Sequence, residues 1–470
     1  MIKNFVISIL KTLEFCDTMY SRGHVMDYLR RKIDKFLDEW FISENKKPLI
    51  IKGARQIGKT KTVEEFAKRN NLSLVEINFV LNPEYRDIFD GGYKVDKILE
   101  NISLIDPSLE FIPGKTLIFF DEIQKCVNAA TSLKSFKLDG RFDVICSGSL
   151  MGLSYKEIES VSTGHKIDYT MYSMDFEEFL WALGYKEEQI EKVYECMKEL
   201  TPLSDSQFNV LLERFHQYMV LGGMPEIVKL FVNQKNYSGT LELQKQIILD
   251  YEEDITKYAE GLDKTKILNV FRKIPVFLSQ ENKKFRISKV AHGARNREYV
   301  GVTDWLIDAG IVNVSYCLND LALPLKGNYD PDNYRMYFMD TGLLVASLDE
   351  ESSKDLRENK NFNTYKGGIY ENVVADMLKK SGYDLYFFKS EDATQEVEFF
   401  VRNANNLIPI DVKATDGKMK SVKSFIEDEK ISDINFGIKL AEKNVGFANN
   451  IYTFPYFLTF LLKRFLSEQK

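Results

Sequence analysis

The sequence has few of the residues that build disulfide frameworks and metal centres. Of 470 residues, five are cysteine and four are histidine. The cysteines are widely spaced and form no Cys-x-x-Cys pair, so we expect neither a disulfide framework nor a cysteine zinc site. The histidines show no ligand spacing such as HExxH, which disfavours a histidine metal enzyme. This cysteine usage is typical of a reducing compartment, and we expect a cytoplasmic protein.

Long apolar runs are also missing. No stretch of about 18 apolar residues occurs, and the N-terminal FVISIL is shorter than a signal-peptide core. We therefore expect a soluble protein with no membrane partner. With 11 prolines and 26 glycines, the chain is neither collagenous nor extensively disordered. Lysine and arginine number 63 against 70 acidic residues, a net charge of −7, so any contact with nucleic acid must come from a local patch.

The order of apolar and helical patterns predicts the architecture. From residue 48 onward, short apolar runs (PLIIK, SLVEINF, TLIFF and FDVICS) alternate with helical patterns, which is the signature of a parallel α/β sheet. Helical patterns dominate from MDFEEFLWALGY to about residue 260. Two short helices, the second near residues 299–309, and a strand hairpin that begins with the strand-like IVNVSY favour a winged helix. The last part begins with the helical YKGGIYENVVADMLKK, after which LYFFK, EVEFFV and LIPIDVKA predict three strands.

One motif predicts a phosphate-binding loop. It matches G-x-x-x-x-G-K-[ST] between an apolar run and a helix, with Lys61 following, and its residues are Gly53, Ala54, Arg55, Gln56, Ile57, Gly58, Lys59 and Thr60. Backbone N–H groups of such a loop wrap phosphates, and the following helix presents its N-terminus to their charge. We expect Lys59 to reach the β- and γ-phosphates of ATP and Thr60 to bind Mg²⁺.

A second motif supplies the carboxylates that this chemistry requires. TLIFFDEIQ places Asp121 at the end of a buried strand, where it would hold Mg²⁺, and Glu122 follows as the residue that orients and deprotonates a water. The strand FDVICSGS ends in Ser147 and Ser149, candidates for sensing the γ-phosphate. The Asp-Glu pair favours hydrolysis over phosphoryl transfer, although a small-molecule kinase stays open.

These motifs carry a family resemblance. GARQIGKT, FFDEIQ, ICSGS, MDFEEFL, LGGMPE, ILDYEEDITKY, YFMDTGLL, ENVVADML, EVEFFV and PIDVKA occur in the order found in AAA-type ATPases of bacteria and archaea that have a C-terminal nuclease-like domain of uncharacterised function. The resemblance implies an α/β fold: a P-loop NTPase parallel sheet, a helical lid, a winged-helix segment and a restriction-endonuclease-like α/β domain. It also leads us to expect an arginine after Gly164, where this chain has His165 and Lys166. An arginine acting in trans would need a homo-oligomer, which the sequence leaves open.

The patterns and the resemblance together give the expected domains. They are an N-terminal extension over residues 1–18, a P-loop AAA-type ATPase domain over 19–172, a helical lid or linker over 173–265, a winged-helix-like domain over 266–350 and a nuclease-like domain over 351–470.

The C-terminal part holds candidate nuclease residues. Asp411 and Lys413 are two apart on a predicted strand and so share a face, Glu398 precedes them on another strand, and Glu371 is expected to open a helix after Lys366-Gly367-Gly368. Carboxylates that hold Mg²⁺, here Glu398 and Asp411, and a lysine near the attacking hydroxide are what phosphodiester cleavage needs. This arrangement looks like a PD-(D/E)xK core with the lengths of its carboxylate side chains exchanged. Active cleavage and a degenerate, binding-only domain both stay open.

Residues 281–300 are the candidate DNA contact. Six basic residues against Glu281 and Glu298 give this segment a local charge of about +4, in contrast to the acidic chain. We therefore predict an Mg²⁺-dependent ATPase coupled to DNA binding through this segment and the C-terminal domain, with DNA cleavage as a further possibility. The alternative is an ATP-dependent switch that binds a protein partner and has an inactive nuclease-like domain. In that case the basic segment would be a solvated face or the partner of acidic helices.

Overall fold

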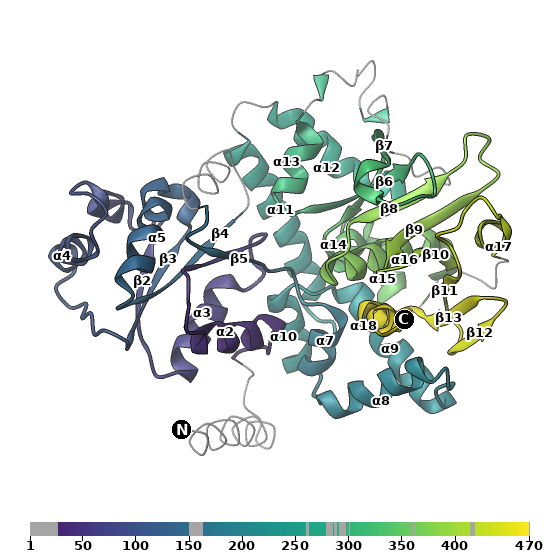
Figure 1. The fold of residues 1–470 in the computed structure, drawn as a ribbon, viewed down its shortest axis with the longest axis horizontal. Coiled ribbons are helices and arrows are strands. Elements are labelled where there is room, and N and C mark those ends of the chain that lie inside the picture. Colours follow the sequence, from purple (N-terminus) through teal and green to yellow (C-terminus); the bar gives the residue numbers. More distant parts are fainter. Residues whose placement is uncertain are drawn as a thin grey trace.

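The structure is a computed structural model that describes residues 27–149, 163–259, 263–278, 285, 289–290, 298–299, 301–358, 360, 362–413 and 419–469. The N-terminal extension expected over residues 1–18 lies outside these ranges. Figure 1 shows an α/β region at one end, a second sheet at the other and a group of helices between them. Within the described ranges, no helix is both long and apolar enough to cross a bilayer.

The N-terminal region contains a five-stranded sheet whose strands are parallel, as the alternating pattern predicted. Its strands are β1 (Leu49–Lys52), β2 (Ser73–Asn78), β3 (Thr116–Asp121), β4 (Asp143–Gly148) and β5 (Ile167–Thr170). Their order is β2-β3-β4-β1-β5. Since neighbouring strands run the same way, the carboxyl ends of β1, β2, β3 and β4 meet at one edge of the sheet.

Helices cover both faces of this sheet because its strands are apolar on both sides. The helices are α2 (Lys32–Ile42), α3 (Lys59–Arg69), α4 (Val95–Ile105) and α5 (Val127–Asp139), with the short η1 (Pro83–Phe89) and η2 (Ile123–Lys125). On β1, Leu49 and Ile51 join the core that includes α2 and α3, whereas Ile50 joins the core formed with α4 and α5. This alternation fixes the register of the strand and the position of the loop that follows it.

Helices dominate between the two sheets, where the sequence shows helical patterns. They are α7 (Phe176–Ala182), α8 (Glu187–Lys198), α9 (Asp205–Leu221), α10 (Pro225–Gln234), α11 (Thr240–Tyr258) and α12 (Lys264–Leu278). In Figure 1, α11 occupies the middle of the molecule. Its residues pack in the same hydrophobic core as residues of both sheets, so it connects the two ends of the protein.

The C-terminal region is built on an eight-stranded mixed sheet. Its strands are β6 (Val312–Leu318), β7 (Tyr329–Phe338), β8 (Leu385–Lys389), β9 (Glu396–Arg402), β10 (Leu407–Lys413), β11 (Gly437–Ala441), β12 (Gly446–Ala448) and β13 (Ile451–Pro455), in the order β12-β13-β11-β10-β9-β8-β6-β7. Its helices are α13 (Val302–Asp308), α14 (Thr341–Ala346), α15 (Glu350–Arg357), α16 (Phe362–Lys380), α17 (Lys420–Glu427) and α18 (Leu462–Glu468), with η5 (Leu325–Gly327) and η6 (Tyr456–Leu461).

Two strands that the sequence analysis assigned to a winged helix are part of this sheet. β6 and β7 form the expected hairpin, but β6 also pairs in parallel with β8, with Ser315 opposite Leu385. The predicted boundary near residue 350 therefore does not separate two sheets. The inner edge of the hairpin is covered by an apolar strand, which local periodicity could not reveal.

Helix α16 also differs from its prediction. Glu371 was expected to open a helix after two glycines, yet α16 begins at Phe362 and places Glu371 in its interior. The reason is packing: a Cβ at Gly368 would lie 2.5 Å from the backbone oxygen of Leu278 at the end of α12. Glycine serves here for a close approach between two elements, not as a helix boundary.

Three motifs that are far apart in the sequence meet at the junction between the helices and the C-terminal sheet: MDFEEFL, LGGMPE and YFMDTGLL. Buried Asp340 accepts hydrogen bonds from the Ser173 hydroxyl at 2.9 Å and from the backbone N–H of Gly223 at 2.7 Å. A Cβ at Gly223 would lie 1.8 Å from the backbone oxygen of Met174, and one at Gly342 would lie 2.2 Å from that of Leu221. The glycines allow backbones to touch, and the carboxylate of Asp340 satisfies the donors that this contact buries.

Candidate functional site

The phosphate-binding loop lies at the edge of the sheet where the strands end. Residues 53–58 leave β1, and Lys59 begins α3. Gln56 and Gly58 have φ values of 61° and 91°, a left-handed conformation that turns the chain back toward the helix. Such a turn points successive backbone N–H groups into one concave site and suits it to anionic phosphate.

Lys59 lies inside this turn. It is 8% exposed, and its Nζ donates hydrogen bonds to the backbone oxygens of Gly53 at 3.1 Å and Ala54 at 2.7 Å. Burial lowers the pKa of Lys59 to about 8, although the charges of Glu122 and Asp121 oppose this shift. The ammonium is thus held at the loop by weak carbonyl acceptors that a phosphate, with its full charge, can replace.

Asp121 is the centre of a hydrogen-bonded cluster at the end of β3. Its Oδ2 accepts from the Thr60 hydroxyl at 3.2 Å and from the Asn78 amide at 3.0 Å, and its Oδ1 accepts from the Ser147 hydroxyl and from the backbone N–H of Glu122. These side chains come from α3, β2 and β4, so the convergence of strand ends builds the cluster. A hydroxyl beside a carboxylate is a donor set that suits Mg²⁺, so the residues present fit this ion.

Glu122 follows in a left-handed conformation, with φ of 56°. This conformation is uncommon for a residue with a side chain and turns the carboxylate away from the path of the strand. Its Oε2 accepts a hydrogen bond from the Gln124 amide, whose nitrogen also lies 3.0 Å from the Ser149 hydroxyl. Sequence analysis named Glu122 but missed Gln124 and Asn78, which hold the two acidic side chains in place.

Helix α11 lies against the outer side of the loop. The Arg55 guanidinium pairs with Asp254 at 2.6 Å, and the Gln56 amide donates to Asp250 at 2.6 Å. Partial burial lowers the pKa of Arg55, but the charges of Asp254 and Glu122 outweigh burial and raise it overall. Lys61 turns to Glu64 and Asp27, at 3.1 and 3.6 Å. The ILDYEEDITKY motif is therefore part of the site.

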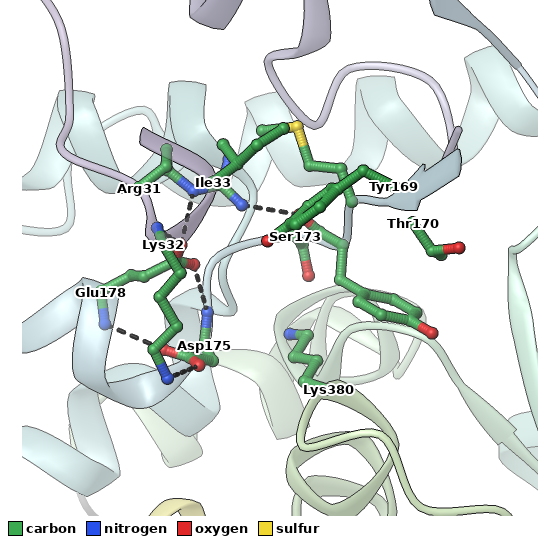
Figure 2. Close-up of a pocket in the computed structure, with 11 residues that line it drawn as sticks. Arg31, Lys32, Ile33, Tyr169, Thr170, Ser173, Asp175, Glu178 and Lys380 are labelled. Carbon is green, nitrogen blue, oxygen red and sulfur yellow. Dashed lines mark hydrogen bonds and ion pairs between the residues drawn. The ribbon is translucent and has the colours of Figure 1, made fainter. Parts of the chain in front are cut away.

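Arg31 supports the loop from the opposite side. Its guanidinium is buried and donates to the backbone oxygens of Ile57 at 2.8 Å and Tyr172 at 2.7 Å, while Glu178 pairs with its Nε at 3.1 Å. Asp175 caps α7 and pairs with Lys32. Figure 2 shows these side chains around a pocket of about 80 Å³ that Lys380 of α16 also lines. The MDFEEFL motif, at the start of α7, thus connects the phosphate-binding loop and α2 to the helices that follow.

The C-terminal candidates are also brought together. The Lys413 ammonium lies 2.6 Å from Asp411, and Glu398 accepts from the backbone N–H of Val412 at 3.2 Å. The charges of Glu398, Asp411 and Glu371 all raise the pKa of Lys413, against the effect of burial. Burial and the charge of Asp411 raise the pKa of Glu398 to about 8. The four residues therefore form one cluster across α16, β9 and β10.

A cation that the sequence analysis missed lies in this cluster. Arg335 on β7 is 2% exposed, pairs with Glu396 and approaches Glu371 at 3.9 Å. Tyr337 donates to Glu371 at 3.3 Å, and Lys389 pairs with Glu396 at 2.6 Å. Within the described ranges, no group of three or more His, Cys, Asp or Glu side chains is arranged to hold a metal ion. The Mg²⁺ sites at Asp121 and at Glu398 with Asp411 stay predictions.

Lys166, near the position of the expected arginine, lies apart from the phosphate-binding loop of the same chain. Lys166 pairs with Asp168 at the start of β5, where Ile167 lies beside Leu49, at the end of the sheet away from the phosphate-binding loop of the same chain. Most of the basic segment over residues 281–300 lies outside the described residues, including Arg295 and Arg297.

Comparison with known families agrees with the N-terminal geometry. Residues 45–180 match the family described as "AAA domain", which together with the parallel sheet and its loop supports an AAA-type P-loop domain. Residues 212–354 and 366–457 match two families described as domains of unknown function, DUF8612 and DUF4143.

The relatives are distant. An uncharacterized protein of Methanocaldococcus jannaschii is 23% identical over 385 residues, which are 76% of this chain and 77% of the relative. The Walker-type ATPase of Pyrococcus abyssi is 14% identical, with 70% of this chain and 98% of that one covered and a TM-score of 0.41. The Orc1 protein of Aeropyrum pernix, solved in complex with DNA, is 10% identical, with 71% and 91% covered and a TM-score of 0.27.

Proposed function

We propose that the N-terminal region binds ATP with Mg²⁺ and hydrolyses it. The contact of the Thr60 hydroxyl with Asp121, 3.2 Å apart at the mouth of the phosphate-binding loop, carries this proposal, because it places a hydroxyl and a carboxylate beside Lys59. The loop N–H groups and Lys59 bind the phosphates, and Thr60 and Asp121 hold the ion. Mg²⁺ would neutralise charge that develops on the phosphate oxygens.

In this proposal, Glu122 is the general base. It follows Asp121 directly and has a left-handed backbone conformation. Glu122 orients a water for attack on the γ-phosphate and accepts the proton of that water. The Ser147 hydroxyl, at the end of β4, senses the γ-phosphate. Since a kinase would leave water out of the reaction, hydrolysis with no acceptor other than water separates the two readings.

The test is phosphate release from ATP and Mg²⁺ by the full chain. Glu122→Gln should bind ATP with nearly wild-type affinity but turn over at least about 100-fold more slowly, because the base is removed while the phosphate contacts remain. Glu100→Gln, an exposed carboxylate on α4 that pairs with Lys97 at 3.0 Å, is the matched control. An unchanged rate for Glu122→Gln contradicts the proposal.

For the C-terminal region, we propose a nuclease-like domain that does not cleave DNA, as in the switch alternative. The observation in its favour is Arg335, which pairs with Glu396 and lies 3.9 Å from Glu371. Arg335 and Lys389 thus give two internal cations to the carboxylate beside Glu398 and Asp411, the residues that cleavage would use for metal. The test is to incubate the protein with plasmid, single-stranded DNA or RNA in the presence of Mg²⁺ or Mn²⁺. Cutting that is abolished by Asp411→Ala and by Lys413→Ala would show nuclease activity and would overturn the proposal of an inactive domain.

DNA binding through residues 281–300 is a separate part of the proposal. The basic composition of this segment supports it, and bonds to phosphates would make log K fall linearly with log salt. Replacing Arg295 and Arg297 by alanine should reduce this slope by about one for each phosphate that the variant no longer binds. A salt-independent affinity, or none, leaves a protein partner as the target of the switch.

A further inference from the structure

Arg55 reaches from the phosphate-binding loop to both the proposed base and helix α11. One guanidinium nitrogen lies 2.6 Å from Asp254, and another lies 3.2 Å from the Tyr258 hydroxyl and 3.9 Å from Glu122. Its Nε is buried and makes no hydrogen bond to any residue in the described ranges. A planar guanidinium can hold three such partners in one geometry, which the point charge of a lysine cannot.

Helix α11 fixes Arg55 at the backbone as well as at the side chain. The Tyr251 hydroxyl donates to the backbone oxygen of Arg55 at 2.9 Å, and the ring of Tyr258 lies under its guanidinium with 5.1 Å to the centroid. Tyr251, Asp254 and Tyr258 are spaced three and four apart, so they share one face of the helix. A shift of α11 would therefore move both the backbone and the guanidinium of Arg55.

The other end of α11 contacts the helices that lead to the C-terminal sheet. Gln244 donates to the backbone oxygens of Val220 and Leu221, both at 2.9 Å, and Arg357 of α15 donates to the Thr240 hydroxyl at 3.1 Å. The same helix thus touches the phosphate-binding loop and the junction where Asp340 lies. Its position can depend on both.

The Arg55 guanidinium lies closer to the Asp254 carboxylate than to the Glu122 carboxylate. At 2.6 Å, the pair with Asp254 is a charge-assisted hydrogen bond, whereas the 3.9 Å to Glu122 leaves that carboxylate attracted but free to accept a proton. Asp254 also offsets part of the charge of Arg55, so the base is oriented without being locked in an ion pair.

We propose that Arg55 is a positioning residue that orients Glu122 for hydrolysis, and that Asp254 on α11 sets the position of Arg55. This inference rests on the proposed ATP hydrolysis and adds its regulation: the rate at the loop depends on the placement of α11.

The test separates turnover from nucleotide binding. kcat is measured by phosphate release, and affinity is measured with a methylanthraniloyl derivative of ADP. Arg55→Ala should lower kcat by about tenfold or more and leave affinity for the probe within about threefold, since the phosphate contacts remain. Arg55→Lys should recover part of the rate because it restores the charge but not the three-way contact.

A double variant tests the role of Asp254. Asp254→Asn should lower kcat less than Arg55→Ala, and the two changes together should cost no more than Arg55→Ala alone, because both act through the same guanidinium. Glu252→Gln is the matched control: it lies on the same helix but pairs with Arg272 at 2.5 Å instead of with the loop. Thermal midpoints near that of the wild type confirm that the variants fold.

The outcomes are distinct. A wild type that hydrolyses no ATP refutes the proposed function itself. A wild type that turns over, with kcat of Arg55→Ala within twofold of it, overturns the role of Arg55. Multiplying effects of Arg55→Ala and Asp254→Asn overturn the link through α11.

Discussion

The two ends of the molecule each collect acidic side chains and a lysine at strand ends, but they compensate the charge differently. At the N-terminal site, Asp121 is bound by the uncharged donors of Thr60, Asn78 and Ser147. At the C-terminal site, carboxylates pair with cations: Glu396 with Arg335 and Lys389, and Asp411 with Lys413.

This difference bears on what each site can do. A carboxylate held by neutral donors keeps its negative charge available for an incoming cation. The charge of a carboxylate that pairs with a buried guanidinium is already neutralised within the fold. This difference underlies the chemistry proposed at one end and the structural role proposed at the other, although the residue types and their places in the sheets are similar. The contrast shows why a pattern of Asp, Glu and Lys defines a candidate fold more securely than an activity.

The largest effect is expected from removing the buried cation of the C-terminal site. Arg335→Met leaves Glu371 and Glu396 without their guanidinium partner, and breaking a buried ion pair in this way costs about 3–5 kcal/mol. The thermal midpoint should fall by several degrees. Arg402→Met, at the exposed end of β9, is the control and should change stability little. A stable Arg335→Met protein would break the comparison, since the pairs would then not be structural.

The opposite result is expected for Lys59→Ala at the N-terminal site. The Lys59 ammonium bonds only two loop carbonyls, Gly53 and Ala54, among the contacts described, so its loss should shift the thermal midpoint little. ATP turnover should fall by about 100-fold or more, as when a preorganised donor to developing charge is removed. Lys68→Ala, an exposed lysine two turns along α3, is the control for phosphate release. A large fall in the thermal midpoint of Lys59→Ala together with an unchanged rate of ATP turnover would reverse the contrast.

Local sequence predicted most residues of the N-terminal cluster, although not Asn78 and Gln124, and fewer of the C-terminal one. The phosphate-binding loop is contiguous in the sequence, and the apolar strands of the sheet that positions it are recognisable as local patterns. Lys59, Thr60 and Asp121 could therefore be assigned to the strand ends of this sheet from the sequence. Glu398, Asp411 and Lys413 were also found, because they lie on neighbouring strands of one meander.

Arg335 could not be found in this way. It lies on β7, which joins the sheet through the parallel pairing of β6 with β8, and no local pattern encodes that long-range contact. For the same reason, Gly368 suggested a helix boundary where the structure has a close approach to α12. The arginine at the loop, Arg55, was visible in the motif, but its partner Asp254 comes from a helix almost two hundred residues later.

A third acidic location, Asp376 on α16, extends the comparison to the junction between the ends. It is buried beside Lys380 at 2.7 Å, and burial raises the pKa of Asp376 to about 7; Lys380 opposes this shift, while the charges of Asp340 and Asp175 add to it. An unfolded aspartate has a pKa of about 3.9, so between about pH 4 and 7 the folded state binds more protons, and stability from this group falls as pH rises.

The variant Asp376→Asn tests this dependence. Relative to the variant, the wild type should lose stability as pH increases from 5.5 to 7.5, by at most about 1.4 kcal/mol per pH unit, because only the wild type must release the proton. Thermal midpoints at several pH values give the difference. Asp392→Asn, at an exposed turn where the Ser390 hydroxyl lowers the pKa of Asp392, should show no trend in this window. A rising or flat difference for Asp376→Asn contradicts the assignment.

The smallest effect is expected from one neutral donor of the N-terminal site. Asn78→Ala removes the amide that donates to Asp121 at 3.0 Å and leaves the Thr60 and Ser147 hydroxyls in place. Loss of one such hydrogen bond costs about 1 kcal/mol, so the Mg²⁺ concentration for half-maximal ATP turnover should rise about fivefold while kcat at saturating Mg²⁺ changes little. The measurement is a Mg²⁺ titration of phosphate release.

Asn70→Ala is the control for this titration, since the amide of Asn70 donates to the backbone oxygen of Phe66 at the end of α3 and does not reach Asp121. A rise of the half-maximal Mg²⁺ concentration in Asn78→Ala alone would sharpen the contrast between the two ends, because it would show that neutral donors tune the carboxylate for the ion. The Asn78 side-chain oxygen, which accepts from the backbone N–H groups of Val80 and Leu81, is lost in the same variant. An equal response of the two variants would mean that the Asn78 amide has no specific effect on the ion, which contradicts the prediction.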